Sequence, residues 1–213
     1  MTTRRSPRPP LTRETVVDTA LSILARVGLP DLTMRAIGAE LGVQQSALYH
    51  HFANKQALLG AVADRIVAGS PHTTDAPTWR GQARQRSADL HAAVTTYPDG
   101  ADLVMSMWAF GVGARAPFDE MHDLLARAGL PAEVAPTAAR TLLHFVYGHA
   151  YDEQSHAHAT RSGITADEHA RTNFDAGLDI VLTGIEGLLA GHGAGEETHD
   201  RSSDTLAPGC PPS

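Results

Sequence analysis

Several features that mark other protein classes are missing from this 213-residue sequence. Its single cysteine, Cys210, rules out an intramolecular disulfide framework. No apolar run approaches the roughly 18 residues that a membrane-spanning helix needs. No apolar segment follows the arginines of residues 1–13, so a signal peptide is not expected either. These absences predict a cytoplasmic protein that makes no contact with a membrane.

The sequence also lacks the short motifs of common enzyme classes. It contains no Gly-x-Ser-x-Gly motif and no P-loop, and Gly111-Val-Gly113 lacks the third glycine of a dinucleotide site. We therefore predict that the protein is not an enzyme and needs no cofactor. Twelve histidines invite a search for metal ligands, but His144 and His149 are five residues apart and do not stack on one helical face. His156 and His158 fall in an expected loop, so we predict no metal site.

Charge is distributed unevenly along the chain. The net charge is −7, which by itself argues against a nucleic-acid partner. Residues 1–60, however, carry seven basic and four acidic side chains, a net +3 that leaves −10 for the remainder. A weakly basic first quarter on an acidic body is typical of a protein that contacts phosphate with one end only.

The stretch from Leu32 to Lys55 has the pattern of two short helices around a tight turn. The Thr33 hydroxyl can cap the first helix, and Gly42 can end it in a left-handed conformation. Residues 45–51 are expected to form the second helix. This pattern predicts a helix-turn-helix, whose second helix enters the DNA major groove. Two helices around a glycine also occur in helical proteins that never bind DNA, so the pattern alone leaves both readings open.

Helical spacing continues on both sides of this stretch. A helix is expected from Arg13 to Val27, capped by Thr12, ended by Gly28 and with Val27 in its buried stripe, and another begins after Asn54. Later helices are expected over residues 79–97, 101–110, 117–128, 132–156 and 164–189. Because no strand pattern is present, the sequence predicts an all-α fold.

Residues 11–66 resemble the DNA-binding domain of the tetracycline-repressor (TetR) family. The matching elements fall in register: the helix ending at Gly28, Leu32-Thr33, the turn from Ala39 to Val43, Leu48-Tyr49-His50-His51-Phe52, and Asn54-Lys55 with Leu58-Leu59. The rest of the chain is similar to the C-terminal domain of the tetracycline repressors on Trp79, Asp99-Gly100-Ala101, Gly148 and Gly177-Leu178 with Gly184.

This resemblance implies a ligand-responsive transcriptional regulator, a repressor by family expectation, that binds palindromic operator DNA as a homodimer. We expect a disordered basic arm (1–11), an N-terminal three-helix helix-turn-helix domain (12–66), a C-terminal helical effector-binding and dimerisation domain (67–190) and a disordered tail (191–213). Two alternatives stay open. One is a helical binding protein or enzyme that kept the fold and lost DNA binding; the other is a DNA-binding protein without an effector.

Candidate DNA-contacting residues lie on the two helices of the motif. Gln45 and Arg35 occupy base-reading positions by resemblance, and their side chains match the edges of adenine and guanine. Ala47 is small enough to touch a thymine methyl group, whereas His51, next to Phe52, could instead be a packing residue. Phosphate contacts are expected from Thr33, Tyr49, His50, His51 and Lys55. The full set of expected DNA contacts is Thr33, Arg35, Gln44, Gln45, Ser46, Ala47, Tyr49, His50, His51 and Lys55.

The resemblance also implies a small-molecule pocket in the second domain. Aromatic and polar residues are the candidates, and burial of the polar ones would require partners. They are Trp79, Gln82, Arg86, Met107, Trp108, Phe118, His144, Tyr147, His149 and Tyr151. Ordinary core packing is the alternative for most of the aromatic members.

This sequence departs from the tetracycline repressors at their drug site. By alignment, the magnesium-coordinating histidine and the polar drug-binding residues fall at or near Pro71, Arg86 and Val104. None of these can make the same contacts, although His72 lies next to Pro71. We therefore expect an effector other than tetracycline with magnesium. Arg86 would favour an anionic or carbonyl-rich ligand if it faces the pocket.

The two long C-terminal helices are apolar around much of their girth, so each must bury two faces. One face can pack on its own domain and the other on a second copy of the chain, and Gly177 and Gly184 lie one heptad apart. A helix central to a monomer is the alternative. The resemblance implies a four-helix dimer interface, with Leu142, Phe145, Phe174, Leu178, Val181 and Ile185 as candidate contacts.

Overall fold

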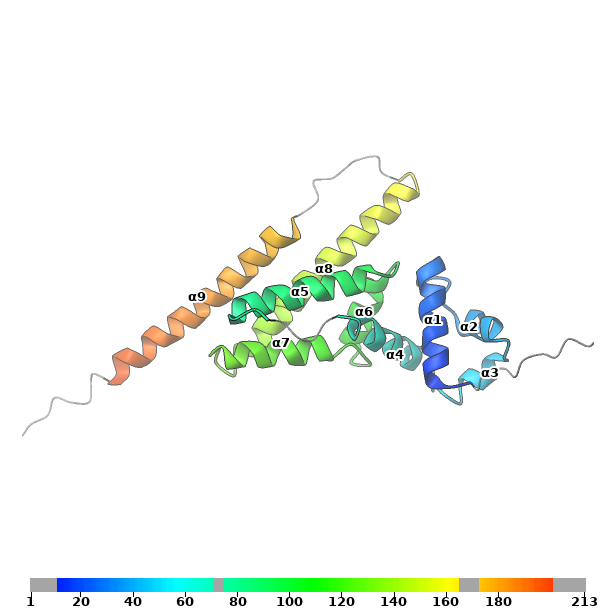
Figure 1. The fold of residues 1–213 in the computed structure, drawn as a ribbon, viewed down its shortest axis with the longest axis horizontal. Coiled ribbons are helices and arrows are strands. Elements are labelled where there is room, and N and C mark those ends of the chain that lie inside the picture. The colour runs from blue at the N-terminus through cyan, green and yellow to red at the C-terminus, as the bar shows by residue number, and fades with distance from the viewer. Residues whose placement is uncertain (1–10, 71–74, 165–172, 201–213) are drawn as a thin grey trace, which may run out of the picture.

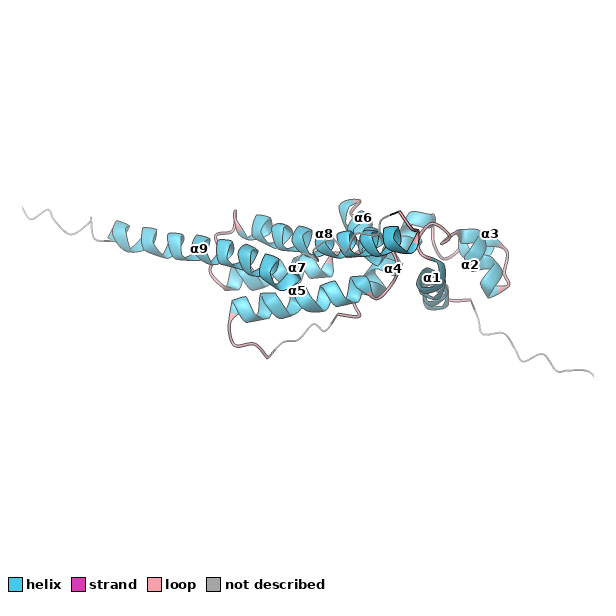
Figure 2. Ribbon diagram, turned by 90° about the horizontal axis from the view of Figure 1, so that it is seen from above, coloured by secondary structure: helices cyan, strands magenta, loops and turns pink. Residues whose placement is uncertain are grey.

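The computed structural model describes residues 11–70, 75–164 and 173–200, with the backbone alone over 192–200. Within these residues the protein is all-helical, as predicted. Its helices are α1 (Arg13–Val27), α2 (Met34–Leu41), α3 (Gln45–Leu48), α4 (Lys55–Val67), α5 (Trp79–Thr95), α6 (Gly100–Ala109), α7 (Ala116–Arg127), α8 (Ala135–Arg161) and α9 (Phe174–Asp200). In Figure 1, α1–α3 lie at one end of an elongated molecule, and α9 extends past the other helices at the opposite end, as Figure 2 also shows. None of the described helices has the length and apolar content needed to cross a membrane.

Local sequence signals place the first helices correctly. Thr12, Thr33 and Asn54 each accept a hydrogen bond at 2.8–3.2 Å from the backbone amide three residues further on. These bonds satisfy amides that have no partner within the first turn of a helix. Gly28 and Gly42 follow α1 and α2 with φ of +78° and +61°, a region that glycine enters without a Cβ clash. The predicted bounds of α1 are confirmed.

Other helix bounds differ from the prediction. The second helix of the motif ends at Leu48 instead of residue 51, and Val27 is 50% exposed rather than buried. The polar segment 155–161, expected to be a loop that contains His156 and His158, continues α8. Similarly, α9 continues to Asp200, beyond the expected start of the tail at residue 191. Apolar periodicity could not reveal these extensions, because a helix end exposed to water needs no apolar stripe.

Three predicted segments fall wholly or partly outside the described residues. They are most of the basic arm, the segment that begins the expected helix at Ile164, and the end of the tail from residue 201.

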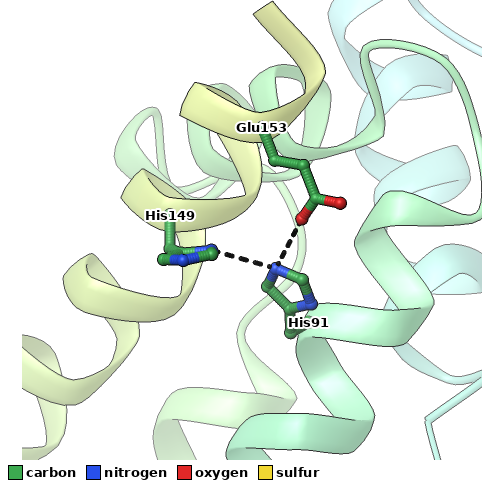
Figure 3. Close-up of side chains that lie close together, drawn as sticks. All are labelled: His91, His149 and Glu153. Atoms are coloured by element: carbon green, nitrogen blue, oxygen red, sulfur yellow. Dashed lines mark hydrogen bonds and ion pairs between the residues drawn. The ribbon is translucent and has the colours of Figure 1, made fainter. Parts of the chain in front are cut away.

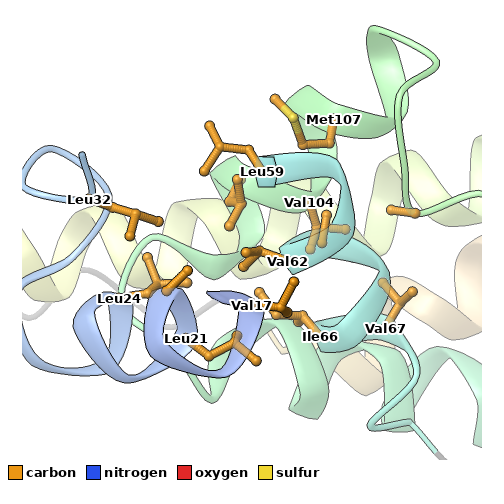
Figure 4. Packing of buried hydrophobic residues seen from close by; sticks show 14 of the residues in the cluster. Val17, Leu21, Leu24, Leu32, Leu59, Val62, Ile66, Val67, Val104 and Met107 are labelled. Atoms are coloured by element: carbon orange, nitrogen blue, oxygen red, sulfur yellow. The ribbon is translucent and has the colours of Figure 1, made fainter. Parts of the chain in front are cut away.

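One hydrophobic core joins the helix-turn-helix to the helices that follow it. Figure 4 shows Val17 and Leu24 of α1 packed toward Val62 and Ile66 of α4, with Val104 of α6 on the other side. Each of these side chains is at most 5% exposed. Burying one such side chain stabilises the fold by roughly 1.5–3 kcal/mol relative to leaving it in water. Because α4 contributes to both sides of this core, it mechanically connects the two parts of the chain.

A second, smaller cluster holds α7, α8 and α9 together. It includes Met121 and Leu125 of α7, Leu142 of α8, and Leu178 and Ile185 of α9. These side chains are no more than 4% exposed within one protomer. The long C-terminal helix is therefore fixed to its own chain along one face.

Polar contacts and a close backbone approach form a joint between the two parts. The backbone amide of Leu29, which follows α1, donates to the Asp99 carboxylate at 2.8 Å. The amide of Ala114, which follows α6, donates to the Asp64 carboxylate of α4 at 2.7 Å. At Gly113, an added Cβ would lie only 2.5 Å from the carbonyl oxygen of Gly60. A side chain at position 113 would therefore force α4 and the loop after α6 apart.

Candidate functional site

The helix-turn-helix presents a polar face to solvent. Leu48 and Phe52 are 0% and 1% exposed, which fixes the inner face of α3 and its following turn on the core. The predicted DNA contacts that are exposed are Arg35, Gln44, Gln45, Ser46, Tyr49 and His50, whereas Thr33, Ala47, His51 and Lys55 are half-buried. Solvent can therefore reach a continuous set of the predicted side chains around α3.

Within this face, Gln45 and Tyr49 contact one another. The Gln45 Nε2 donates to the Tyr49 hydroxyl at 3.2 Å, because the two residues are one helical turn apart. The pair holds an amide and a phenol side by side, where both can offer hydrogen bonds to a base edge or a phosphate.

Several basic residues of the first domain are engaged within the protein, among them Arg65, which pairs with Asp18 at 2.8 Å. Arg26 forms a bidentate pair with Glu40, at 2.9 and 2.5 Å, and this hydrogen bonding lowers the pKa of the Glu40 carboxyl. The guanidinium of Arg13 lies 4.1 Å from the centre of the Phe52 ring and donates to the His51 carbonyl oxygen. Arg13 thereby ties α1 to the turn after α3. The sequence pattern did not indicate this role, because Arg13 is the first residue of its helix and outside the apolar stripe.

The structure divides the predicted ligand-binding residues. Trp108 lies beside Phe118, His144 and Tyr147, with ring centroids 5.4–6.3 Å apart, and the guanidinium of Arg140 lies 5.3 Å from the Trp108 ring. The other predicted residues are elsewhere. Met107 is in the core of the joint, Tyr151 is 46% exposed on α8, His149 packs against His91, and Trp79, Gln82 and Arg86 lie on α5.

A small cavity lies between α4, α5, α7 and α8. Its volume is about 20 Å³, room for about one water molecule. The lining consists of Val67, Ser70, Arg86, Leu90, Pro117, Glu120, Met121 and Leu143. Of the residues predicted to bind a ligand, only Arg86 is in this lining. The cavity is therefore too small for an effector of ordinary size unless the surrounding helices move.

Arg86 does not have the free charge that the anionic-ligand hypothesis requires. Its Nη1 donates to the Glu120 carboxylate at 2.9 Å, and the two side chains are 18% and 34% exposed. The pair places opposite charges together at the cavity wall, so the net field that an anion would experience is weak. The contacts of Arg86 thus do not support an anionic effector.

Three buried polar atoms have no hydrogen-bond partner among the described residues. They are Arg86 Nε and Ser87 Oγ on α5, and the Tyr147 hydroxyl on α8. Burial raises the pKa of Tyr147, which keeps its hydroxyl protonated and able to donate. A buried polar group without a partner costs roughly 1–3 kcal/mol, so a ligand that supplies partners would recover free energy here.

Of the six predicted dimer contacts, three are covered by the protein's own chain. Leu142, Leu178 and Ile185 are 0–4% exposed within the protomer, whereas Phe145, Phe174 and Val181 are half-buried. The exposed apolar residues of this region are others, chiefly Ile180 at 75% and Leu188 at 43%. Helix periodicity predicts two apolar faces on α9 but does not tell which of them packs within the chain.

A further group of side chains was missed by the sequence analysis. His91 of α5 meets His149 and Glu153 of α8, as Figure 3 shows, and we call these three residues the histidine cluster. His149 and Glu153 are four residues apart and share a helical face. That spacing was visible in the sequence, but the third member, His91, is separated from His149 by 58 positions. The spacing arguments that predict no metal site do not include this group.

Known proteins share both parts of this architecture. Residues 16–62 match the family model described as bacterial regulatory proteins of the tetR family, and residues 70–172 match that of the tetracyclin repressor-like C-terminal domain. The class C tetracycline repressor of Escherichia coli is 36% identical over 204 residues, covering 83% of this chain and 91% of the repressor.

Solved structures agree with these matches. The crystal structure of BioQ with its natural double-stranded DNA operator is 35% identical, with a TM-score of 0.71 over 83% of this chain and 98% of that one. Streptomyces coelicolor ActR in complex with (S)-DNPA is 28% identical, with a TM-score of 0.69 over 85% of this chain and 98% of that one.

Proposed function

This chain belongs to the TetR family of bacterial regulatory proteins, and on that premise we propose that it is a ligand-responsive transcriptional repressor. It binds palindromic operator DNA as a homodimer and is released by a small molecule. The observation that carries this proposal is the exposed polar face on α2 and α3, with Arg35, Gln45 and Tyr49 directed to solvent above a buried Leu48. Such a protein acts in the cytoplasm, where its operator lies, and has no catalytic role.

In this proposal Gln45 and Arg35 read bases, each contributing ~1–3 kcal/mol of discrimination. The bond between Gln45 and Tyr49 favours this role, because it orients the Gln45 amide before DNA arrives. The phosphate contacts fall to the half-buried Thr33 and Lys55 and to the exposed residues around α3. Both Thr33 and Lys55 are at helix starts, where the helix dipole favours an anion.

A second copy of the chain binds the exposed face of α8 and α9. Ile180 and Leu188 supply apolar contact on α9, and Gly184 leaves open space where a Cβ would be. Gly148 and the 46% exposed Tyr151 lie on the matching side of α8. Two copies are needed because successive major grooves of a palindrome are about 34–36 Å apart.

The effector enters at the small cavity between α4, α5, α7 and α8, which Arg86 lines. The Arg86 Nε and, elsewhere on α5 and α8, the hydroxyls of Ser87 and Tyr147 have no hydrogen-bond partner among the described residues. A neutral ligand with hydrogen-bonding groups suits this site better than an anion, because Glu120 already neutralises Arg86. Tetracycline with magnesium does not suit it. Val104, one of the positions that align at or near the magnesium- and drug-binding residues of tetracycline repressors, is apolar and 0% exposed.

Binding reaches the DNA-binding end through α4. Val67 and Ser70, at the C-terminal end of this helix, line the cavity, and Asp64 on the same helix holds the loop after α6. We expect a ligand that widens the cavity to displace the end of α4, one of the four helices that line it. Because α4 shares its core with α1, movement of α4 also moves the helix-turn-helix. The ligand therefore favours a conformer in which the recognition helices of the two copies are wrongly spaced for successive major grooves of the operator.

The decisive experiment is selection of bound sequences from random duplex DNA by the purified full chain at near-physiological salt. We expect an enriched palindrome with half-sites about one helical turn apart. In fluorescence anisotropy on that palindrome, Arg35→Ala and Gln45→Ala should each weaken binding roughly 5- to 150-fold. Gln85→Ala, on the exposed side of α5, is the matched control and should bind like the wild type.

No enriched sequence from a folded, dimeric protein would refute operator binding. That result would favour the alternative in which the protein kept the fold but lost DNA binding and acts as a helical binding protein or enzyme. Ligand binding by the second domain would then be measured directly. Operator binding that no small molecule releases would instead favour a regulator without an effector.

A further inference from the structure

The histidine cluster brings three metal-binding groups from two helices to one point. The Nε2 of His91 lies 3.3 Å from the Nδ1 of His149 and 3.3 Å from the Oε2 of Glu153. One ligand atom from each residue lies within 4.8 Å of the other two. Figure 3 shows both α8 side chains directed at the His91 ring.

These spacings fit a tetrahedral ion. Zn²⁺ binds imidazole nitrogen at about 2.0–2.1 Å and carboxylate oxygen at about 2.0–2.2 Å, so neighbouring ligand atoms around it are roughly 3.3–3.5 Å apart. Two of the three separations in the cluster already have this length. The third can close by rotation of Glu153, whose side chain is 59% exposed and free to change rotamer.

The surroundings favour the neutral, metal-binding form of His91. His91 is half-buried, with a side chain 18% exposed, and the Phe174 ring lies 4.5 Å from its ring centroid and 5.2 Å from that of His149. Burial lowers the pKa of His91, an effect that the Glu153 carboxylate opposes and His149 reinforces. A neutral imidazole offers the lone pair that a metal ion requires.

We propose that His91, His149 and Glu153 bind one divalent transition-metal ion per protomer, with Zn²⁺ the ion that best suits this ligand set. Two nitrogens and one carboxylate oxygen disfavour Mg²⁺ and Ca²⁺, which take oxygen ligands. Three protein ligands leave the fourth position of a tetrahedral site open to water. The ion joins α5 to α8 beside the start of α9, a role separate from operator reading.

A metal-free hydrogen-bonded trio would have the same spacings, so the experiment measures the ion itself. Untagged full-length protein is treated with chelator, and Zn²⁺ is then titrated in competition with a chromophoric chelator. We expect one equivalent per protomer. Substitution of Co²⁺ should give the intense visible absorption of a tetrahedral site.

His91→Gln and His149→Gln should each weaken Zn²⁺ binding by at least about 10–100-fold, and Glu153→Gln by about 10-fold. His122→Gln is the control, because His122 also lies 3.3 Å from a carboxylate, that of Asp123, but on the surface of α7. Circular dichroism of each variant verifies the fold. If His91→Gln unfolds, His149→Gln and Glu153→Gln decide the question, because each removes a ligand from α8 and leaves α5 unchanged.

Two results would overturn the proposal. One is wild-type affinity for Zn²⁺ in His149→Gln and Glu153→Gln. The other is a loss of Zn²⁺ affinity in His122→Gln as large as that in the cluster variants, which would indicate adventitious binding to surface histidines. Neither outcome bears on operator selection, so failure of the metal site would leave the proposed regulatory function intact.

Discussion

Gly113→Ala tests whether the joint between α4 and the loop after α6 is as tight as the structure indicates. The added Cβ would lie 2.5 Å from the carbonyl oxygen of Gly60, 2.8 Å from its Cα and 2.9 Å from its carbonyl carbon. Ordinary contact starts at 3.4 Å, so the two backbones must separate by about 0.9 Å, and overpacking of this kind costs roughly 1–3 kcal/mol. All three atoms belong to the backbone and cannot rotate away, which favours the upper half of that range.

One opposing effect must be subtracted. Replacing glycine by alanine restricts the unfolded chain, which stabilises the protein by about 0.4–1 kcal/mol. The net expectation is a loss of about 1–2.6 kcal/mol. At about 2–4 °C per kcal/mol for a chain of this size, the melting temperature should fall by roughly 2–10 °C.

Urea unfolding at fixed protein concentration, followed by circular dichroism, measures this loss. Gly191→Ala is the control, because an added Cβ there would have no heavy atom within 4 Å and α9 is helical at that position. The control should therefore leave stability unchanged or raise it. Equal or greater stability of Gly113→Ala would refute the reasoning, since it would mean that the loop after α6 moves aside without cost.

Three further results are expected. Asp99→Ala should lower the free energy of unfolding in urea by about 1–3 kcal/mol. It removes the hydrogen bond from the Leu29 amide that joins the two parts of the chain, and it places alanine at a φ of +57°. Asp99→Asn keeps an acceptor for that amide and should retain most of the stability. Ile180→Glu should convert the proposed dimer into a monomer, as measured by light scattering. Ile164→Glu is the matched control, because Ile164 is equally exposed (76% against 75%) but lies outside the proposed interface, and this variant should remain dimeric. Chelator-treated protein should lose stability as the pH falls below about 6.5. Burial lowers the pKa of His91 in the folded protein, so below this pH His91 binds more protons in the unfolded chain than in the folded one. His91→Gln should flatten the dependence of the melting temperature on pH below about 6.5. An unchanged dependence would refute the assignment of this pH effect to His91.

Short-range signals account for what the sequence predicted well. A threonine or asparagine cap acts on an amide three residues away, and a glycine acts on its own φ, so Thr12, Asn54 and Gly42 could be assigned without knowledge of the fold. The exposed face around Gln45 was predictable for the same reason. Once Leu48 and Phe52 are inside, helical geometry places Gln45 and Tyr49 outside.

Contacts between distant segments were less accessible. Nothing in the local pattern around Arg86 reveals that Glu120, 34 positions later, neutralises it. The two faces of α9 are similarly ambiguous, because Leu178 and Ile180 are both apolar, yet one is 0% and the other 75% exposed. Periodicity identifies an apolar face, but only packing decides which neighbour covers it.

The two proposed small-ligand sites share one helix, and this has a thermodynamic consequence. Ser87, which has an unpartnered hydroxyl, and His91, the metal ligand, are one turn apart on α5. The effector cavity widens by movement of α4, α5, α7 or α8, and a metal ion at His91 and His149 would hold two of these helices, α5 and α8, together. If both sites are occupied in turn, each ligand must alter the affinity of the other by the same factor, because linkage between binding sites is reciprocal. The metal ion would then oppose release from the operator and set the effector concentration at which the repressor responds.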